Sequence, residues 1–223
     1  MKLPPWSYTM LDTAETCPSQ AFHKFILKER EPESAVSRHG TDVHKALEHY
    51  VRDGAPLGVY DRHEPLARSM RGMAGAPGIQ TFTEVKLGVR PNLTSCDFFA
   101  GDVWGRGVVD VALLSQVAGF IGDWKTGKKR EKALQTTVFA LMIFAKFPAL
   151  ERLTACNLWL TDNTIGEIRK FKREDTPTYW TTVVQKVEAL EKLAAKDEPW
   201  PARPNGLCRE WCSVLSCPHN GRH

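Results

Sequence analysis

The spacing of hydrophobic residues divides the chain into a helical first part, a middle part of short strands and a last part in which helices and strands alternate. Hydrophobic positions recur at helical spacing over residues 7–30, where Pro18 suits a break or the start of a new helix beside Cys17, and again over residues 40–54. We expect the helix of residues 40–54 to begin at Thr41 or Asp42, whose side chains can cap it, and to end at Gly54.

Residues 55–80 carry only a weak pattern, and we expect a short helix between loops there. The middle of the chain changes character. Residues 82–89 alternate in polarity, residues 105–114 are a run of β-branched side chains, and residues 119–126 are another short hydrophobic run. Because these three predicted strands lie close together in the sequence, we expect an antiparallel meander.

The last part of the chain, from residue 131 onward, alternates between helix and strand. Residues 131–147 have high helix propensity, residues 153–161 and 165–171 predict two strands, and residues 178–195 predict a final amphipathic helix. This order predicts an α/β fold, with a mixed central β-sheet flanked by helices, in a single domain over residues 1–223.

Composition agrees with a soluble, intracellular globular domain. Of 223 residues, 42% are hydrophobic and 25% are charged, which is typical of such chains. The formal net charge of +4 permits a nucleic-acid partner without arguing strongly for one. No segment has the hydrophobic length of a membrane span, so we expect no membrane partner.

The six cysteines are unevenly distributed. Cys208, Cys212 and Cys217 lie close together near the end of the chain, whereas the others are scattered: Cys17, Cys96 and Cys156. Structural disulfides are rare in a reducing compartment, so the clustered thiols are better interpreted as ligands. Three thiols are one short of a closed four-ligand site.

The segment FIGDWKTGKKR ends a hydrophobic strand with an acid and a base. Asp123 and Lys125 share one face of that strand, and Asp110 interrupts the hydrophobic run of the strand before it. Two carboxylates on neighbouring strands could bind Mg²⁺ or Mn²⁺, with Lys125 stabilising charge at a phosphate. The alternatives are a buried salt bridge from Asp110 to Arg106 or Lys86, and an incidental ion pair at the strand end.

An Asp on one strand followed by D-x-K on the next resembles the PD-(D/E)XK nuclease superfamily, and its RecB-like branch in particular. The resemblance implies a restriction-endonuclease-like core. It also implies a divalent ion, Mg²⁺ or Mn²⁺, held by His44, Asp110, Asp123 and the carbonyl group of Trp124. The branch has a Q-x-x-x-Y motif on the helix after the lysine; Gln135 matches it and would help to place the substrate, but Phe139 replaces the tyrosine.

Other residues compete for two of these roles. Glu84 and Lys86 form a second E-x-K pair; we interpret Glu84 as an assisting residue or a ligand of a second ion, the alternative being a solvated strand face. His39 and His49 compete with His44, which we favour only because of the resemblance.

In some RecB-like nucleases, one N-terminal cysteine and three C-terminal cysteines hold a 4Fe–4S cluster. Cys17, followed by proline, matches the first, and the C-terminal segment 205–219 supplies Cys208, Cys212 and Cys217. The resemblance implies a cluster that joins the two chain ends. A competing interpretation is Zn²⁺ bound by the three C-terminal cysteines and His219. We favour the cluster.

Taken whole, the chain resembles the stand-alone RecB-like exonucleases of phages and prophages. This implies a metal-dependent DNA exonuclease acting in recombination, repair or replication in the cytoplasm of a bacterial host cell. DNA is the expected partner, with a single-strand-binding or strand-annealing recombination protein as a second. The alternatives are an endonuclease for branched or single-stranded DNA and a non-catalytic DNA-binding subunit.

Overall fold

The structure is a computed structural model that describes residues 2–29 and 34–222. The chain divides into two compact units. The first, which we call the sheet unit, is the continuous segment Glu33–Trp180, and the second, the terminal unit, combines residues 1–32 with residues 181–223. All residues of the predicted catalytic site belong to the sheet unit, and all those of the predicted cysteine site belong to the terminal unit.

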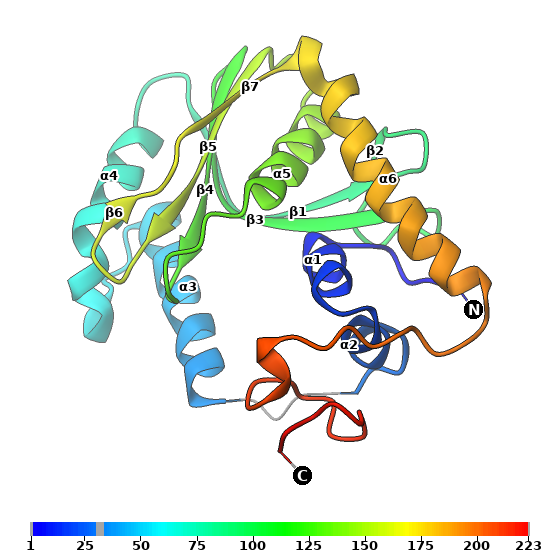
Figure 1. Cartoon of the computed structure of the whole chain (residues 1–223). Helices are drawn as coiled ribbons and strands as arrows, with labels where there is room; N and C mark the ends of the chain where they lie inside the picture. The colour runs from blue at the N-terminus through cyan, green and yellow to red at the C-terminus, as the bar shows by residue number, and fades with distance from the viewer. Residues whose placement is uncertain (1, 30–33, 223) are drawn as a thin grey trace. The chain divides into compact units, whose positions relative to one another are not determined.

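A mixed sheet of seven strands forms the centre of the sheet unit (Figure 1). The strand order is β2-β1-β3-β4-β5-β6, and β7 also pairs with β5. The predicted antiparallel meander is present as β1, β3 and β4, and β5 then pairs parallel to β4. The strands are β1 (Gln80–Val89), β2 (Ser95–Cys96), β3 (Gly105–Leu114), β4 (Ala118–Lys125), β5 (Arg152–Trp159), β6 (Thr164–Ile165) and β7 (Arg169–Lys172).

Helices flank this sheet on both faces (Figure 1). Helices α3 (Ala35–Asp53) and α4 (Glu64–Ala74) lie on one side, and α5 (Ala133–Lys146) lies on the other. Val43 and Leu47 of α3 are fully buried in a hydrophobic cluster that includes Val111 of β3. The predicted fold class is confirmed: an α/β fold whose mixed sheet is flanked by helices, consistent with a restriction-endonuclease-like core.

Helix α3 begins earlier than the sequence predicted. The expected start at Thr41 or Asp42 is wrong, because the Ser34 hydroxyl caps the helix and accepts the Ser37 N–H at 3.0 Å. Thr41 lies inside the helix. The predicted end is confirmed, since Gly54 adopts a left-handed conformation with φ of 75°.

Two other boundaries differ from expectation. The short helix expected within residues 55–80 is present, but it is an eleven-residue helix, α4, preceded by a 3₁₀ turn (Gly58–His63). The strand expected over residues 165–171 is divided into β6 and β7, which both pair with β5. A further 3₁₀ turn (Arg173–Asp175) follows β7.

The two ends of the chain pack together in the terminal unit. Ser19 N–H donates to the Pro201 carbonyl oxygen at 3.1 Å, and the rings of Phe22 and Trp200 lie 5.9 Å apart. The break expected at Pro18 is confirmed, since α1 ends at Thr16 and a new helix begins at Pro18. The elements are α1 (Tyr8–Thr16), α2 (Pro18–Ala21), the π-helix Phe22–Ile26, the turn Gly206–Cys208, and α6 (Thr176–Ala195), which begins in the sheet unit.

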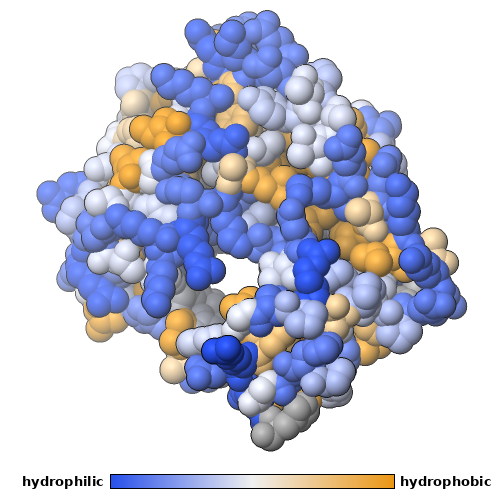
Figure 2. All heavy atoms as spheres, in the orientation of Figure 1, coloured by the Kyte–Doolittle hydropathy of each residue, from blue (hydrophilic) through white to orange (hydrophobic). Residues whose placement is uncertain are grey.

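The surface is predominantly polar on the face drawn in Figure 2, with smaller hydrophobic areas between hydrophilic side chains. None of the described helices combines the length and the apolar character that crossing a bilayer requires. That the two units act as one nuclease domain stays a prediction.

Candidate active site

The candidate site lies where strands β3 and β4 stop pairing. Their register runs from Leu114 opposite Gly119 to Val111 opposite Gly122, yet both strands continue beyond that point. Asp110 and Asp123 are the next residue on each strand. In place of a ladder hydrogen bond, Trp124 N–H donates to Asp110 Oδ2 at 2.7 Å. The end of the pairing therefore places two carboxylates beside each other at the edge of the hydrophobic core.

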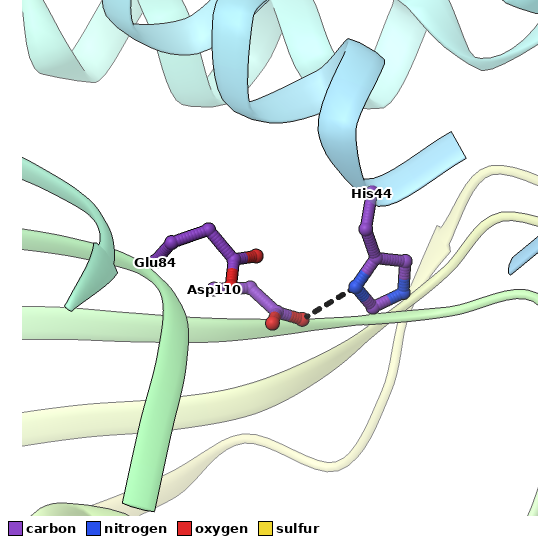
Figure 3. A group of neighbouring side chains, drawn as sticks. All are labelled: His44, Glu84 and Asp110. Carbon is purple, nitrogen blue, oxygen red and sulfur yellow. Dashed lines mark ion pairs between the residues drawn. The ribbon is translucent and has the colours of Figure 1, made fainter. Parts of the chain in front are cut away.

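Three side chains converge around Asp110 as a potential metal site (Figure 3). One ligand atom from each of His44, Glu84 and Asp110 lies within 4.8 Å of the others. His44, on α3, approaches Asp110 with its Nδ1 atom 3.5 Å from Oδ2. One imidazole nitrogen and two carboxylate oxygens are a donor set that suits a divalent cation such as Mn²⁺ or Mg²⁺. These residues could hold such an ion.

Glu84 reaches this group through an unusual backbone conformation. Its φ of 49° falls in the left-handed region, in the middle of strand β1. A non-glycine residue there is uncommon, and such strain is concentrated at functional sites. The kink gives Glu84 the position of a third ligand beside His44 and Asp110, so the residue that the sequence suggested only as an assistant belongs to the same group.

The electrostatics of the site favour a bound cation. Burial, reinforced by the negative charge of Asp110, raises the pKa of Glu84 to about 7 and that of Asp123 to about 6. Burial alone lowers the pKa of His44, but the hydrogen bond and charge of Asp110 outweigh it, so the net shift is upward. Carboxyl groups packed this closely retain protons unless a bound cation takes the place of those protons.

Asp123 is buried and takes part in a second, closed network. Lys125 forms an ion pair with Asp123 Oδ2, and Gln135 of α5 donates from Nε2 to Asp123 Oδ1 at 3.0 Å. Lys125 Nζ in turn donates to Gln135 Oε1 at 3.0 Å. Both ends of the Gln135 amide are thus used to position the acid and the base, and its expected contact with substrate stays a prediction.

Two alternatives from the sequence concern the partner of Asp110 and the choice of histidine. Among the described residues, Asp110 contacts His44 and the Trp124 backbone, and no salt bridge joins it to Arg106 or Lys86. His49 pairs with Asp53 at 3.7 Å, away from the group of three.

Trp124, an expected site residue, and Phe139, which replaces the tyrosine of the motif, are largely buried. The Trp124 side chain belongs to the hydrophobic core, which leaves its backbone as the part that could serve a metal ion. Phe139 is 7% exposed, so it packs in the core rather than presenting a ring to DNA.

One residue near the site was not found from the sequence. Glu131 joins the segment after Lys125 to the sheet, since its carboxylate accepts Asn157 Nδ2 at 2.7 Å and Trp159 Nε1 at 3.1 Å. A third contact comes from the Glu167 N–H at 3.1 Å. Because these partners lie far along the chain, no local pattern indicates them.

The four predicted cluster cysteines line one pocket of the terminal unit, together with His219. Burial raises the pKa of Cys212, and the nearby thiols of Cys208, Cys217 and Cys17 add to that shift. Two backbone N–H groups, those of Arg203 and Asn205, point at the sulfur atoms of Cys17 and Cys208, each at 3.4 Å. Hydrogen bonds to sulfur are among the features that tune iron–sulfur clusters.

The spacing of these thiols bears on which metal they fit. In the part of the chain that the structure describes, no three of the cysteine sulfur or His219 nitrogen atoms lie within 4.8 Å of one another. Tetrahedral zinc, with Zn–S bonds of about 2.3 Å, would bring its sulfur ligands to about 3.8 Å apart. The described thiols are therefore not arranged as a closed zinc site.

Comparison with known proteins adds a family match to this geometry. Residues 5–85 match the family model of the PD-(D/E)XK nuclease superfamily. The matched segment contains His44 and Glu84, and it ends before Asp110. A crystal structure of SSO0001 is similar at 13% identity, covering 95% of this chain and 96% of that chain with a TM-score of 0.37, which is too low to carry an argument. No curated protein matches the chain.

The raised pKa values predict how pH controls metal binding. Glu84 and Asp123 hold protons in the folded state that the unfolded chain releases at lower pH, so stability without metal falls as pH rises toward about 7. His44 acts in the same direction, because its raised pKa adds stability that is lost at higher pH. We therefore expect Mn²⁺ to raise Tm more at about pH 8 than at about pH 5.

Differential scanning calorimetry with and without Mn²⁺ measures this directly. The variant Glu84→Gln removes one of the titrating groups and should reduce both the Mn²⁺ effect and its pH dependence. An equal rise in Tm at both pH values would contradict the assignment of the ion to these side chains.

Proposed function

We propose that this protein is a metal-dependent DNA exonuclease. The observation that carries the proposal is the convergence of His44, Glu84 and Asp110 where two strands separate, next to the Asp123–Lys125 pair. The match of residues 5–85 to a nuclease superfamily supports phosphodiester hydrolysis as the reaction class. The exonuclease mode rests on the resemblance to stand-alone RecB-like enzymes.

Each residue then has a defined role. His44, Glu84 and Asp110 hold a divalent ion, with Asp123 and the Trp124 carbonyl group as the further ligands expected from the resemblance. When bound, the ion supplies a Lewis acid and lowers the pKa of a water molecule. Lys125 places a positive charge where negative charge develops on the phosphate, and Asp123 and Gln135 hold the ammonium group in place.

End-labelled linear DNA and covalently closed circular DNA, incubated in parallel with Mn²⁺, test the mode of action. An exonuclease degrades the linear molecule and leaves the closed circle intact. Loss of the circle would instead establish an endonuclease, which single-stranded and branched substrates would then define. DNA binding without hydrolysis would favour the non-catalytic subunit.

We also propose that Cys17, Cys208, Cys212 and Cys217 hold a 4Fe–4S cluster with a structural role. The shared pocket of the four thiols and the two N–H···S contacts support it, and the family resemblance favours it over zinc. The cluster would join the first helices to the C-terminal segment within the terminal unit.

Replacing Cys17 with serine should therefore remove iron and lower the stability of the terminal unit together. Loss of the link is expected to cost at least about 3 kcal/mol, or roughly 10 °C in Tm. Iron analysis and thermal unfolding measure the two effects. Cys96→Ser, at a half-buried thiol of the sheet unit, is the control that should keep both values. Full iron content and an unchanged Tm in Cys17→Ser would exclude the cluster role.

The proposed setting is DNA recombination, repair or replication of a phage or prophage, in the cytoplasm of the bacterial host. Degradation of one strand from an end would produce single-stranded DNA. A single-strand-binding or strand-annealing recombination protein, which would bind this single-stranded product, is the proposed partner.

A further inference from the structure

Two adjacent phenylalanines form an exposed aromatic surface beside the candidate active site. Phe98 and Phe99 follow strand β2, with ring centroids 5.0 Å apart and planes at 77°. Phe99 is 74% exposed. Covering a phenylalanine ring is favourable, so an exposed ring gains free energy when a ligand packs on it.

Two cations flank these rings. Lys86 Nζ lies 5.5 Å from the centroid of Phe99, and Arg106 Cζ lies 5.7 Å from it. Both are also within about 6 Å of Phe98, a distance at which cations and aromatic rings attract. We call Lys86, Phe98, Phe99 and Arg106 the aromatic–cationic patch.

The positive charge of this patch is not neutralised by neighbouring acids. Asp102, which lies in the following loop, is paired with Arg90 at 2.6 Å. Among the residues that the structure describes, neither Lys86 nor Arg106 is in an ion pair, and Arg106 Nε is buried without a hydrogen-bond partner. The patch therefore combines an exposed ring with two cations available to an anion.

The patch lies on the face of the sheet that carries the candidate metal site. Gly107, paired with Leu87, faces α5, since a Cβ atom there would lie 2.9 Å from Met142 Sδ. Because side chains alternate along strands, Lys86 and Arg106 project from the opposite face. Glu84 and Asp110 meet His44 of α3 on that same face. Lys86 is two residues from Glu84, or about 7 Å along β1.

We propose that the aromatic–cationic patch binds single-stranded DNA beside the scissile phosphate, with an unpaired base stacked on Phe99 and the backbone phosphates near Lys86 and Arg106. This inference rests on the proposed nuclease function and specifies its substrate. Exposed aromatic rings combined with cations are the usual means of binding single strands, because every base offers a π face. Paired bases inside a duplex are already stacked and do not reach such a ring.

Fluorescence anisotropy with a labelled single-stranded oligonucleotide, without divalent metal, tests the proposal on the full chain. We expect Phe99→Ala to weaken binding about tenfold, as loss of one stacked base does, and Phe99→Trp to retain it. A duplex of the same sequence should bind both proteins equally. Lys86→Gln should reduce the salt dependence by about 0.7 in log–log slope, the value for one single-strand phosphate contact. The control is Ile168→Ala, an exposed hydrophobic residue of the sheet unit.

The outcomes separate this proposal from the nuclease function. Unchanged single-strand affinity in Phe99→Ala, an equal loss on duplex DNA, or no single-strand binding by the wild type would each overturn the patch. If the wild type still hydrolyses DNA in Mn²⁺ in those cases, the nuclease function stands alone. A selective loss in Phe99→Ala supports the patch whether or not hydrolysis is found.

Discussion

Replacement of Lys125 with alanine is expected to lower the rate of DNA hydrolysis by about 10²- to 10³-fold, the loss found when one electrostatic stabiliser of a transition state is removed. The ammonium group is held by Asp123 and Gln135, so its position is fixed before substrate binds. DNA affinity should change little, because Lys125 is one cation among many. The measurement is single-turnover hydrolysis together with binding of the same DNA.

Lys129→Ala is the matched control for this variant. Lys129 lies four residues further along the chain and pairs with Asp162 on the surface. Its removal should leave the hydrolysis rate unchanged to within a small factor, since exposed ion pairs contribute little. Equal rates for wild type and Lys125→Ala would show that this lysine takes no part in the reaction.

Replacement of Asp110 with asparagine is expected to lower Mn²⁺ affinity by about 10²-fold or more, in line with the effect of disrupting metal-site residues. The side-chain amide of this variant keeps an oxygen that can accept the Trp124 N–H, so the variant should fold, but it loses the negative charge between His44 and Glu84. Titration calorimetry with Mn²⁺ gives the affinity directly.

Asp162→Asn is the corresponding control, because it removes a carboxylate of similar type from an exposed ion pair. It should bind Mn²⁺ as the wild type does. If Asp110→Asn also binds Mn²⁺ unchanged, the ion is held elsewhere and the group of three side chains has another purpose.

Much of the fold follows from local patterns in the sequence. The alternating, β-branched and short hydrophobic runs predicted β1, β3 and β4, and the helix propensity of residues 131–147 predicted α5, whereas the parallel pairing of β5 with β4 was not predicted. The helix boundary at Ser34 was missed because the hydrophobic stripe begins only at Val43. A cap is set by one side chain that accepts one N–H group, and such a contact leaves no periodic signal.

The candidate site was predicted unevenly, for physical reasons. Asp110, Asp123 and Lys125 could be grouped from strand periodicity, and His44 from the family resemblance. The place of Glu84 depends on a left-handed backbone conformation, which its neighbours in sequence do not indicate. The role of Gln135 as a bridge between Asp123 and Lys125 depends on how α5 packs on the sheet, which is set by tertiary contacts.

The aromatic–cationic patch, too, could not be predicted from the sequence alone. The sequence contains Phe98 and Phe99 in an ordinary loop, and Lys86 and Arg106 on two different strands. Only the pairing of β1 with β3 brings the two cations together next to the rings. Exposure of Phe99, the observation that suggests a ligand, is a property of the folded chain.

The central claim is that a divalent ion at His44, Glu84 and Asp110 is required for DNA hydrolysis at this site. Degradation of end-labelled linear DNA by wild type and Asp110→Asn, in Mn²⁺ and in EDTA, tests it most directly. The prediction is that only the wild type in Mn²⁺ degrades the DNA. Degradation in EDTA, or undiminished degradation by Asp110→Asn in Mn²⁺, would contradict it.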